Sequence, residues 1–330
     1  MTSNIASDSI SADLEPIDVS IIMAAYNSEQ YIEEAIDSCL KQTGVTFELI
    51  IIDDGSDRAL APLVEDLTSH DPRVTILATI QNYGPGHARN LGLKVARGEF
   101  VAIVDSDDYL APTRLANLIA QGRVKNADIV VDDLVEVSET KRGRALRPFL
   151  RQSISKRQHV ICLTEFMSSG VRSQGKRCYG YLKPVIRRST LIAGQYAYRS
   201  ALRISEDYYL VSDMLRDGAK MLFVPHAGYY YRKHMGSLTH RADIDAIKAI
   251  VVAEKVLREE SEPALTPQQK QLSKKRSRFY GRMHRFEKMV HSVKSRDYAS
   301  ALRTFTKYPP DMPSQATKVV WLLLKKAFTI

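Results

Sequence analysis

Residues 101–109 read VAIVDSDDY, in which four apolar residues are followed by three carboxylates within four positions. A continuous apolar run rich in β-branched residues predicts a buried strand. Like-charged carboxylates crowded at its end repel one another unless a cation lies between them. We therefore expect a strand over 99–105 and a cation held by the acids that follow it. The alternative is a polar strand end that caps a helix near Pro112.

Three more apolar runs precede this one, and each is followed by a segment with helical features. Such alternation predicts right-handed βαβ units and an α/β fold with a Rossmann-like, mainly parallel sheet flanked by helices. Ligands on such sheets bind beyond the carboxyl ends of the strands, so the polar residues that end these runs should meet at one edge. The predicted strands are VSIIMAA (19–25), FELIIID (47–53) and VTILAT (74–79), and the predicted helices start near 32, 58 and 87.

Composition limits the class of protein. The chain has 330 residues, of which 26% are charged and 44% hydrophobic, as in ordinary folded proteins. Its three cysteines form no CxxC pair, which argues against a disulfide framework and a zinc site and for a cytoplasmic setting. The first 18 residues lack the pattern of a signal peptide, and we expect a flexible leader over 1–18. Neither a GxGxxG after the first strand nor a Walker motif is present, so dehydrogenases and P-loop enzymes are poorly supported.

The C-terminal part of the chain is basic and is predicted to be helical over 246–330. Lysines and arginines are dense over 266–296, and the net charge of the whole chain is +9. The final stretch, KVVWLLLKKAFTI (318–330), has the apolar and lysine pattern of an interfacial helix, which indicates an anionic membrane surface as a partner. The alternative is a solvated basic face. No nucleic-acid-binding signature accompanies the charge, so we expect no nucleic-acid partner.

The segments VSIIMAAYN, FELIIIDDGSDR, GHARNLGL and FVAIVDSDDYLAPTRL occur in the order and spacing of the family 2 glycosyltransferases. The chain resembles this family over about residues 17–240. The resemblance implies a GT-A fold over 19–245, with a nucleotide-sugar-binding half (19–110) and an acceptor-binding half (111–245). Among its subgroups, the chain is most similar to bacterial transferases that assemble exopolysaccharide repeat units, the succinoglycan-type enzymes included.

The resemblance also implies a reaction. It is the inverting, metal-dependent transfer of a hexose, with glucose as the first expectation, from a UDP-sugar to a growing, lipid-linked exopolysaccharide unit. The enzyme would then lie peripherally on the cytoplasmic face of the inner membrane. A transferase for another surface glycan (lipopolysaccharide, teichoic acid or protein) and an inactive binding protein on the same fold are the alternatives.

Site residues follow from the same resemblance. Asp107 is expected to be the direct ligand of Mn²⁺ or Mg²⁺, and Asp105 and Ser106 are expected to contact the ribose or metal-bound water. A hard divalent cation prefers carboxylate oxygens as ligands and also binds the oxygens of a diphosphate, so it would bridge the protein and the donor. Arg89 is expected at the nucleotide, with a solvated helix arginine as the alternative.

The end of the second strand resembles the family's nucleobase motif. A carboxylate suits the uracil N3–H, which is a hydrogen-bond donor, and Asp54 is the expected contact. Asp53 is expected on the ribose or in a structural role. The alternative for the whole segment is a plain turn, which the Asp54-Gly55 pair also signals. Ala25, Tyr26 and Asn27 are expected against the nucleoside, although Tyr26 is equally compatible with core packing.

Two later segments resemble the catalytic part of the family. Asp207 in SEDYYL (205–210) matches the base that removes the acceptor proton, and Glu206 would orient the acceptor or the base. Adjacent acids are also common at helix starts without catalysis.

In YYYRKHMGSLTHR (229–241), the resemblance places Arg232 and Ser237 at the diphosphate and His234 at the metal. His240 is an equal alternative to His234 as the metal ligand, because a neutral imidazole suits manganese-like ions wherever it reaches them. A strand followed by an exposed polar loop is the structural alternative for the whole segment.

Overall fold

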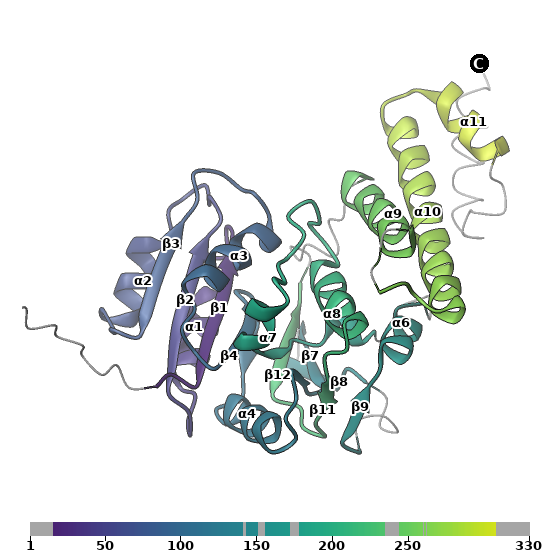
Figure 1. The fold of residues 1–330 in the computed structure, drawn as a ribbon. Helices are drawn as coiled ribbons and strands as arrows, with labels where there is room; N and C mark the ends of the chain where they lie inside the picture. The colour runs from purple at the N-terminus through teal and green to yellow at the C-terminus, as the bar shows by residue number, and fades with distance from the viewer. Residues whose placement is uncertain are drawn as a thin grey trace, which may run out of the picture.

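The computed structural model describes residues 16–140, 143–150, 156–171, 178–234, 244–259, 261 and 263–307. Its larger sheet has eight strands in the order β3-β2-β1-β4-β10-β6-β11-β9 (Figure 1). The first four strands in this order are parallel, whereas β10 runs antiparallel to both neighbours and β9 antiparallel to β11. They are β3 (Val74–Ala78), β2 (Phe47–Asp53), β1 (Val19–Ala25), β4 (Phe100–Asp105), β10 (Val185–Arg187), β6 (Ile129–Val131), β11 (Met221–Phe223) and β9 (His159–Ile161).

The predicted α/β fold is confirmed, and the helices of the parallel half are α1 (Ile32–Leu40), α2 (Ala61–Thr68) and α3 (Pro85–Val95). The α3 helix begins two residues earlier than expected. Gly84 has a φ of 97° that suits the turn before the helix, and the fixed φ of Pro85 suits the first helical position. The helix then packs closely on the sheet at Gly92, where a Cβ atom would lie 2.7 Å from the Ile22 side chain.

Strand register aligns the polar residues that end the parallel strands. Ala25 at the end of β1 lies opposite Asp53 of β2, and Ala24 lies opposite Asp105 of β4. The apolar residues before them are buried. The polar ends of three strands therefore share one edge of the sheet, as the sequence predicted.

A second sheet lies beside this edge. Its four strands, in the order β5-β12-β7-β8, are β5 (Tyr109–Leu110), β12 (Tyr229–Lys233), β7 (Leu134–Thr140) and β8 (Gly143–Pro148). The short β5 strand directly follows the acidic turn after β4 and pairs with β12, with Tyr109 opposite Tyr230. This pairing brings the 229–234 segment to the acidic turn, and that segment is a strand in its described part.

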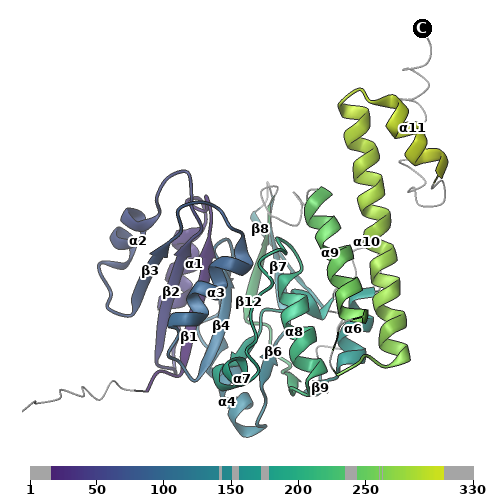
Figure 2. The ribbon, with the colours of Figure 1, turned by 45° about the horizontal axis from the view of Figure 1, so that its top comes forward.

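The remaining helices cover the second half of the chain. Figures 1 and 2 show α9 and α10 side by side, with α10 continuing past the sheets to α11. The start of α10 has a capping box, in which Thr266 and Gln269 each bond the other's backbone N–H. Within the described residues, none of the helices combines the length and apolar composition needed to cross a bilayer. They are α4 (Arg114–Val124), α6 (Leu163–Val171), the short η1 (Tyr179–Tyr181), α7 (Arg188–Ala193), α8 (Glu206–Arg216), α9 (Ile244–Glu259), α10 (Pro267–Lys294) and α11 (Tyr298–Lys307).

Two predictions concern the ends of the chain, which lie largely outside the described residues. Residues 1–15 of the expected leader lie outside them, as does the apolar stretch 318–330. Asp18, which was expected in the leader, is bonded to the fold: its carboxylate accepts the backbone N–H of Thr46 at 2.8 Å and pairs with Arg123. The division at residues 110 and 245 stays a prediction.

A buried ion pair joins the start of α4 to the segment between β6 and β7. Arg114 and Asp132 are both fully buried, with Nη2 and Oδ1 2.8 Å apart. Asp132 also accepts the Gly228 backbone N–H, while Arg114 donates to the Lys183 carbonyl at 2.6 Å. Burial raises the pKa of Asp132, but Arg114 and the surrounding donors outweigh burial and lower it. The pair therefore fixes the backbone at Lys183 and at the start of β12.

We expect Asp132→Asn to lower the free energy of unfolding by about 3–5 kcal/mol at pH 7, because it leaves the Arg114 charge buried and unpaired. The native-state pKa of Asp132 is lowered, so its stabilisation is complete above its ordinary value near 4 and is lost as the pH falls below that. Urea unfolding at pH 7 and pH 3 should show a smaller difference between variant and wild type at pH 3. Asp37→Asn, at an exposed pair with Lys41, is the control. An equal difference at both pH values would contradict this account.

Candidate active site

Three carboxylates converge in the turn between β4 and β5. Ligand oxygens of Asp105, Asp107 and Asp108 lie within 4.8 Å of one another. The turn is closed by the Asp108 N–H, which donates to the Asp105 carbonyl, and Ser106 is buried within it. Asp108 is 1% exposed, and among the described residues its Oδ2 atom has no hydrogen-bond partner.

The electrostatics of this turn favour a bound cation. Burial and the neighbouring Asp105 raise the pKa of Asp107, although His234 opposes them. Burial, Asp107 and Asp105 raise the pKa of Asp108 well above its ordinary value. A divalent ion among these oxygens would relieve the repulsion, so the residues present fit the metal that the sequence predicted. Asp108 was counted among the crowded acids of the sequence but was not named as a site residue, and it belongs to this cluster.

Asp105 is turned toward two buried cations. Arg89 Nη2 lies 2.8 Å from Asp105 Oδ1, and Lys183 Nζ lies 2.7 Å from Oδ2. Burial raises the pKa of Asp105, but Lys183 and Arg89 outweigh it and lower the pKa to about 2. The two cations are themselves almost fully buried. They come from α3 and from the segment just before β10, so they connect β4 to two other parts of the fold.

The same two cations hold the predicted catalytic pair at the start of α8. Arg89 Nη1 lies 2.6 Å from Glu206 and 3.3 Å from Asp207, and Lys183 Nζ lies 3.1 Å from Asp207. Burial raises the pKa of Glu206, which Arg89 opposes and Asp207 reinforces. Asp105 and the acid pair, about a hundred residues apart in the chain, are therefore parts of one ion-pair network.

The β12 strand and the residue that follows it contact the acidic turn through Arg232 and His234. The Arg232 backbone N–H donates to Asp108 Oδ1 at 2.8 Å, and its side-chain Nε donates to the Asp107 carbonyl at 2.9 Å. The Arg232 guanidinium also pairs with Glu34 of α1. His234 Nε2 lies 2.8 Å from Asp107 Oδ2, beside the expected metal ligand. The predicted Ser237 and the alternative His240 lie outside the described residues.

The end of β2 is built into the loop that follows β3. Asp54 is 2% exposed and accepts the backbone N–H groups of Tyr83 and Gly84 at 3.1 and 2.7 Å. Asp53 accepts backbone N–H groups of its own turn, at Ser56 and Leu60, which corresponds to the structural alternative given for it. Gly55 has a φ of 70° and lies so close to Gln81 that any side chain would collide with the backbone there.

The end of β1 lies beside this loop. The Ala25 carbonyl accepts the Asp54 N–H, and Asn27 bonds Ser56 and Asp57 through its backbone and side chain. Tyr26 is 44% exposed, so its core-packing alternative is wrong and its ring is accessible at this edge. The predicted nucleoside-side residues are thus gathered at the ends of β1 and β2.

Two findings on cations differ from the sequence analysis. The solvated alternative for Arg89 is wrong, since the residue is 4% exposed and its guanidinium bonds acids. Lys183 was missed altogether. The sequence feature that could have indicated it is a single lysine between YGYL and the apolar start of β10. A charged side chain in such apolar surroundings is rarely buried unless it is paired.

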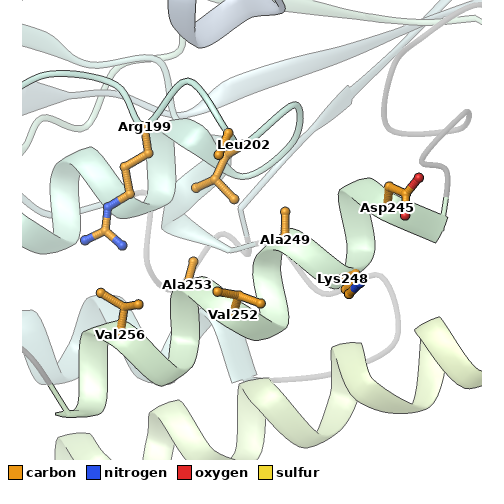
Figure 3. A pocket seen from close by; sticks show the side chains of 9 residues that line it. Arg199, Leu202, Asp245, Lys248, Ala249, Val252, Ala253 and Val256 are labelled. Atoms are coloured by element: carbon orange, nitrogen blue, oxygen red, sulfur yellow. The ribbon is translucent and has the colours of Figure 1, made fainter.

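A separate hollow of about 530 Å³ lies between the 199–202 loop and α9 (Figure 3). It is mostly apolar and contains none of the clustered carboxylates, so it is not the candidate active site. Its lining includes Arg199, Leu202, Lys248, Ala249, Val252 and Val256.

A mixed α/β sheet with carboxylates beyond parallel strand ends, facing an acid pair at a helix start, is the arrangement of a GT-A-type glycosyltransferase. This chain belongs to glycosyltransferase family 2. The family model "Glycosyl transferase family 2" matches residues 20–177. The succinoglycan biosynthesis protein ExoO of Rhizobium meliloti is 37% identical over 287 residues, which cover 87% of this chain and 80% of that protein.

Other proteins are similar to this chain in sequence or in fold. The succinoglycan biosynthesis protein ExoU of Rhizobium meliloti is 29% identical, covering 65% of this chain and 61% of ExoU. The fold matches S. aureus TarS 1–349 in complex with UDP-GlcNAc, with a TM-score of 0.63 at 21% identity over 94% of this chain and 88% of that one. It also matches the mannosyltransferase PcManGT of Pyrobaculum calidifontis in complex with GDP-Man and Mn²⁺, with a TM-score of 0.57 at 15% identity over 93% and 79%. The chain is therefore a family 2 glycosyltransferase related to succinoglycan biosynthesis enzymes.

We expect Asp107→Asn to abolish binding of Mn²⁺ in the presence of UDP, because the change removes an anionic oxygen ligand from the cluster. Isothermal titration calorimetry with MnCl₂ and UDP measures this, and circular dichroism should show an intact fold. Asp37→Asn, on the exposed face of α1, should bind as the wild type does. Wild-type affinity in the Asp107 variant would remove Asp107 from the metal site.

Proposed function

We propose that this enzyme transfers a hexose, with glucose as the first candidate, from a UDP-sugar to a growing exopolysaccharide unit with inversion at the anomeric carbon. The observation that carries the proposal is the network in which Arg89 and Lys183 join Asp105 to the acid pair at 206–207. Because the network brings Asp105 and the acid pair into one site, it supports a direct displacement, in which the diphosphate and the base lie on either side of the reacting carbon.

The donor side is proposed at the ends of β1, β2 and β4. The exposed Tyr26 ring offers a face for the nucleoside, with Ala25 and Asn27 beside it. Asp54 is proposed at uracil, because its carboxylate has acceptor capacity beyond the bonds that it accepts from the Tyr83 and Gly84 amides and the Thr79 hydroxyl. The UDP-GlcNAc complex of TarS is consistent with a UDP-sugar as donor.

The metal is proposed to be held by Asp107, with His234 as a further ligand and Asp105 and Ser106 close by. When bound, a divalent ion supplies Lewis-acid stabilisation of the negative charge that develops on the departing diphosphate. The chain's own residues prepare this position: Arg232 fixes the turn through the Asp107 carbonyl, and His234 contacts the Asp107 carboxylate. The Mn²⁺ complex of PcManGT supports manganese as the first ion to test.

Asp207 is proposed as the base. The acceptor hydroxyl oxygen bonds to the anomeric carbon while the bond from that carbon to UDP breaks, the hydroxyl proton passes to the Asp207 carboxylate, and UDP departs with the bonding electrons. Lys183 and Arg89 lie against the two oxygens of Asp207 and fix its orientation. Glu206, held by Arg89 at 2.6 Å, would orient the acceptor or the base.

The acceptor is proposed to be lipid-linked, and the enzyme to work on the cytoplasmic face of the inner membrane. The similarity to ExoO supports an exopolysaccharide acceptor. Support for membrane contact comes from the basic strip, which we define as the exposed cations of α10, α11 and their connection. The basic strip includes Lys270, Lys274, Lys275, Arg278, Lys288, Lys294, Arg296, Arg303 and Lys307.

The test of function is a screen of UDP-sugars with Mn²⁺, read as UDP release with and without glycan acceptors, followed by linkage analysis of the product. We expect one UDP-hexose to be turned over, and Asp207→Asn to lower kcat by about 10²–10⁴-fold with little change in donor affinity, because a general base acts in the transition state. The exposed Asp66→Asn on α2 is the matched control. No turnover of any UDP-sugar would favour the inactive binding protein, and a fall below tenfold would place the base elsewhere.

We expect the enzyme to co-sediment with vesicles that contain anionic lipid and to be released by salt. Each cation near such a surface contributes about 1 kcal/mol, so Lys274→Gln/Arg278→Gln should weaken binding by about 2 kcal/mol, roughly 30-fold. Lys94→Gln/Lys125→Gln, which removes two exposed cations elsewhere, is the control. Equal binding to neutral and anionic vesicles, or none to either, would contradict the role of the basic strip.

A further inference from the structure

We propose that Arg276 of α10 and Glu254 of α9 are positioning residues for the catalytic acids, acting through the first turn of α8. The C-terminal helices would then be part of the catalytic machinery as well as a surface. This inference rests on the proposed function for the role of Glu206 and Asp207. Its structural half, that these helices hold the start of α8, stands on contacts alone.

The start of α8 has little local support. Ser205, at the N-cap position, has a left-handed backbone with φ of 64°, and its side chain makes no capping hydrogen bond. Capping side chains normally satisfy the first N–H groups of a helix and fix its first turn. Besides the Arg89 and Lys183 contacts to their carboxylates, the place of Glu206 and Asp207 therefore depends on what holds the residues that follow them.

Those residues, Tyr208 and Tyr209, are anchored on the C-terminal helices. The Arg276 guanidinium carbon lies 3.7 Å from the centre of the Tyr208 ring. The Tyr208 ring also stacks on the Phe166 ring of α6, with 5.1 Å between the ring centres. The Tyr209 hydroxyl donates to Glu254 Oε1 at 2.9 Å. A desolvated guanidinium over an aromatic face is a strong form of cation–π contact. Here the aromatic partner, Tyr208, directly follows Asp207 in the sequence.

The charges behind these contacts are paired and buried. Arg276 Nε lies 2.8 Å from Glu254 Oε1, and Ser273 donates to the other carboxylate oxygen. Glu254 is 0% exposed and Arg276 is 4% exposed, so the alternative of a solvated basic face is wrong at this position of α10. A buried charge tolerates few arrangements, because leaving it unpaired is costly. The Arg276–Glu254 pair thus defines one position for Tyr208 and Tyr209.

The acid pair is consequently held from two sides. Arg89 and Lys183 contact the carboxylates themselves, while Arg276 and Glu254 fix the backbone that carries them. A displacement of about 1 Å at a reacting group lowers the rate by roughly 10²-fold. Loss of the Arg276 and Glu254 contacts should therefore lower turnover without changing the affinity for the nucleotide.

The test separates positioning from stability by removing both buried charges together. In Arg276→Met/Glu254→Gln the thermal unfolding midpoint should stay near that of the wild type, because neither partner is left charged and unpaired. We expect kcat to fall by roughly 10²-fold, while the KM for the donor and the Kd for UDP change less than about twofold. Lys255→Met, exposed on α9 next to Glu254, is the control. In Arg276→Ala, guanidinium at sub-denaturing concentration should restore part of the lost rate.

A readout independent of turnover completes the test. Hydrogen–deuterium exchange of the peptide 205–212 should become faster in the double variant, while the peptide 19–25 of β1 stays protected. Unchanged exchange at 205–212, or a folded double variant with wild-type kcat, would overturn the inference. If the wild-type enzyme turns over no UDP-sugar, the proposed function fails, and the exchange result still decides whether these helices hold the start of α8.

Discussion

Arg89 and Lys183 place two buried positive charges among Asp105, Glu206 and Asp207, and the geometry of the site depends on this balance. Without the cations, three carboxylates would repel one another in surroundings that screen charge poorly. The bonds also act as cross-links, because they join β4, α3, the segment before β10 and the start of α8. Electrostatic compensation therefore contributes to where Asp105 and the proposed catalytic acids lie.

The parallel half of the fold could be predicted from the sequence because its signals are local. Each of its strands is a mainly apolar run, and the polar residues that end three of these runs, at Asn27, Asp53 and Asp105, mark the edge of the sheet. The second half of the sheet could not be predicted in the same way. Strands such as β10 and β11 have three residues each, too few for a periodic pattern to be recognised.

The site was predictable in its acids and much less so in its cations. Acids grouped at strand ends and helix starts, such as Asp107 and Asp207, are visible as short motifs. Lys183 and Arg276 carry no such motif, because what distinguishes them is burial against partners far away in the chain. A count of charges along the sequence assigned Arg276 to a basic surface, whereas tertiary packing made it an internal contact of α8.

The pairing of β5 with β12 has a consequence for how the protein is made. Several contacts that complete the site join residues far apart in the chain: Arg89 and Glu206 are 117 positions apart, and Asp107 and His234 are 127 positions apart. On the ribosome, the parallel half emerges first and already contains both partners of the Arg89–Asp105 pair, whereas the contacts from Lys183 and β12 require residues that are synthesised later. Such non-local closure is slow compared with local folding. Until residue 234 has emerged, the acidic turn of the nascent chain lacks the contacts that Arg232 and His234 make with it, so the active site is the last part of the sheet edge to be completed.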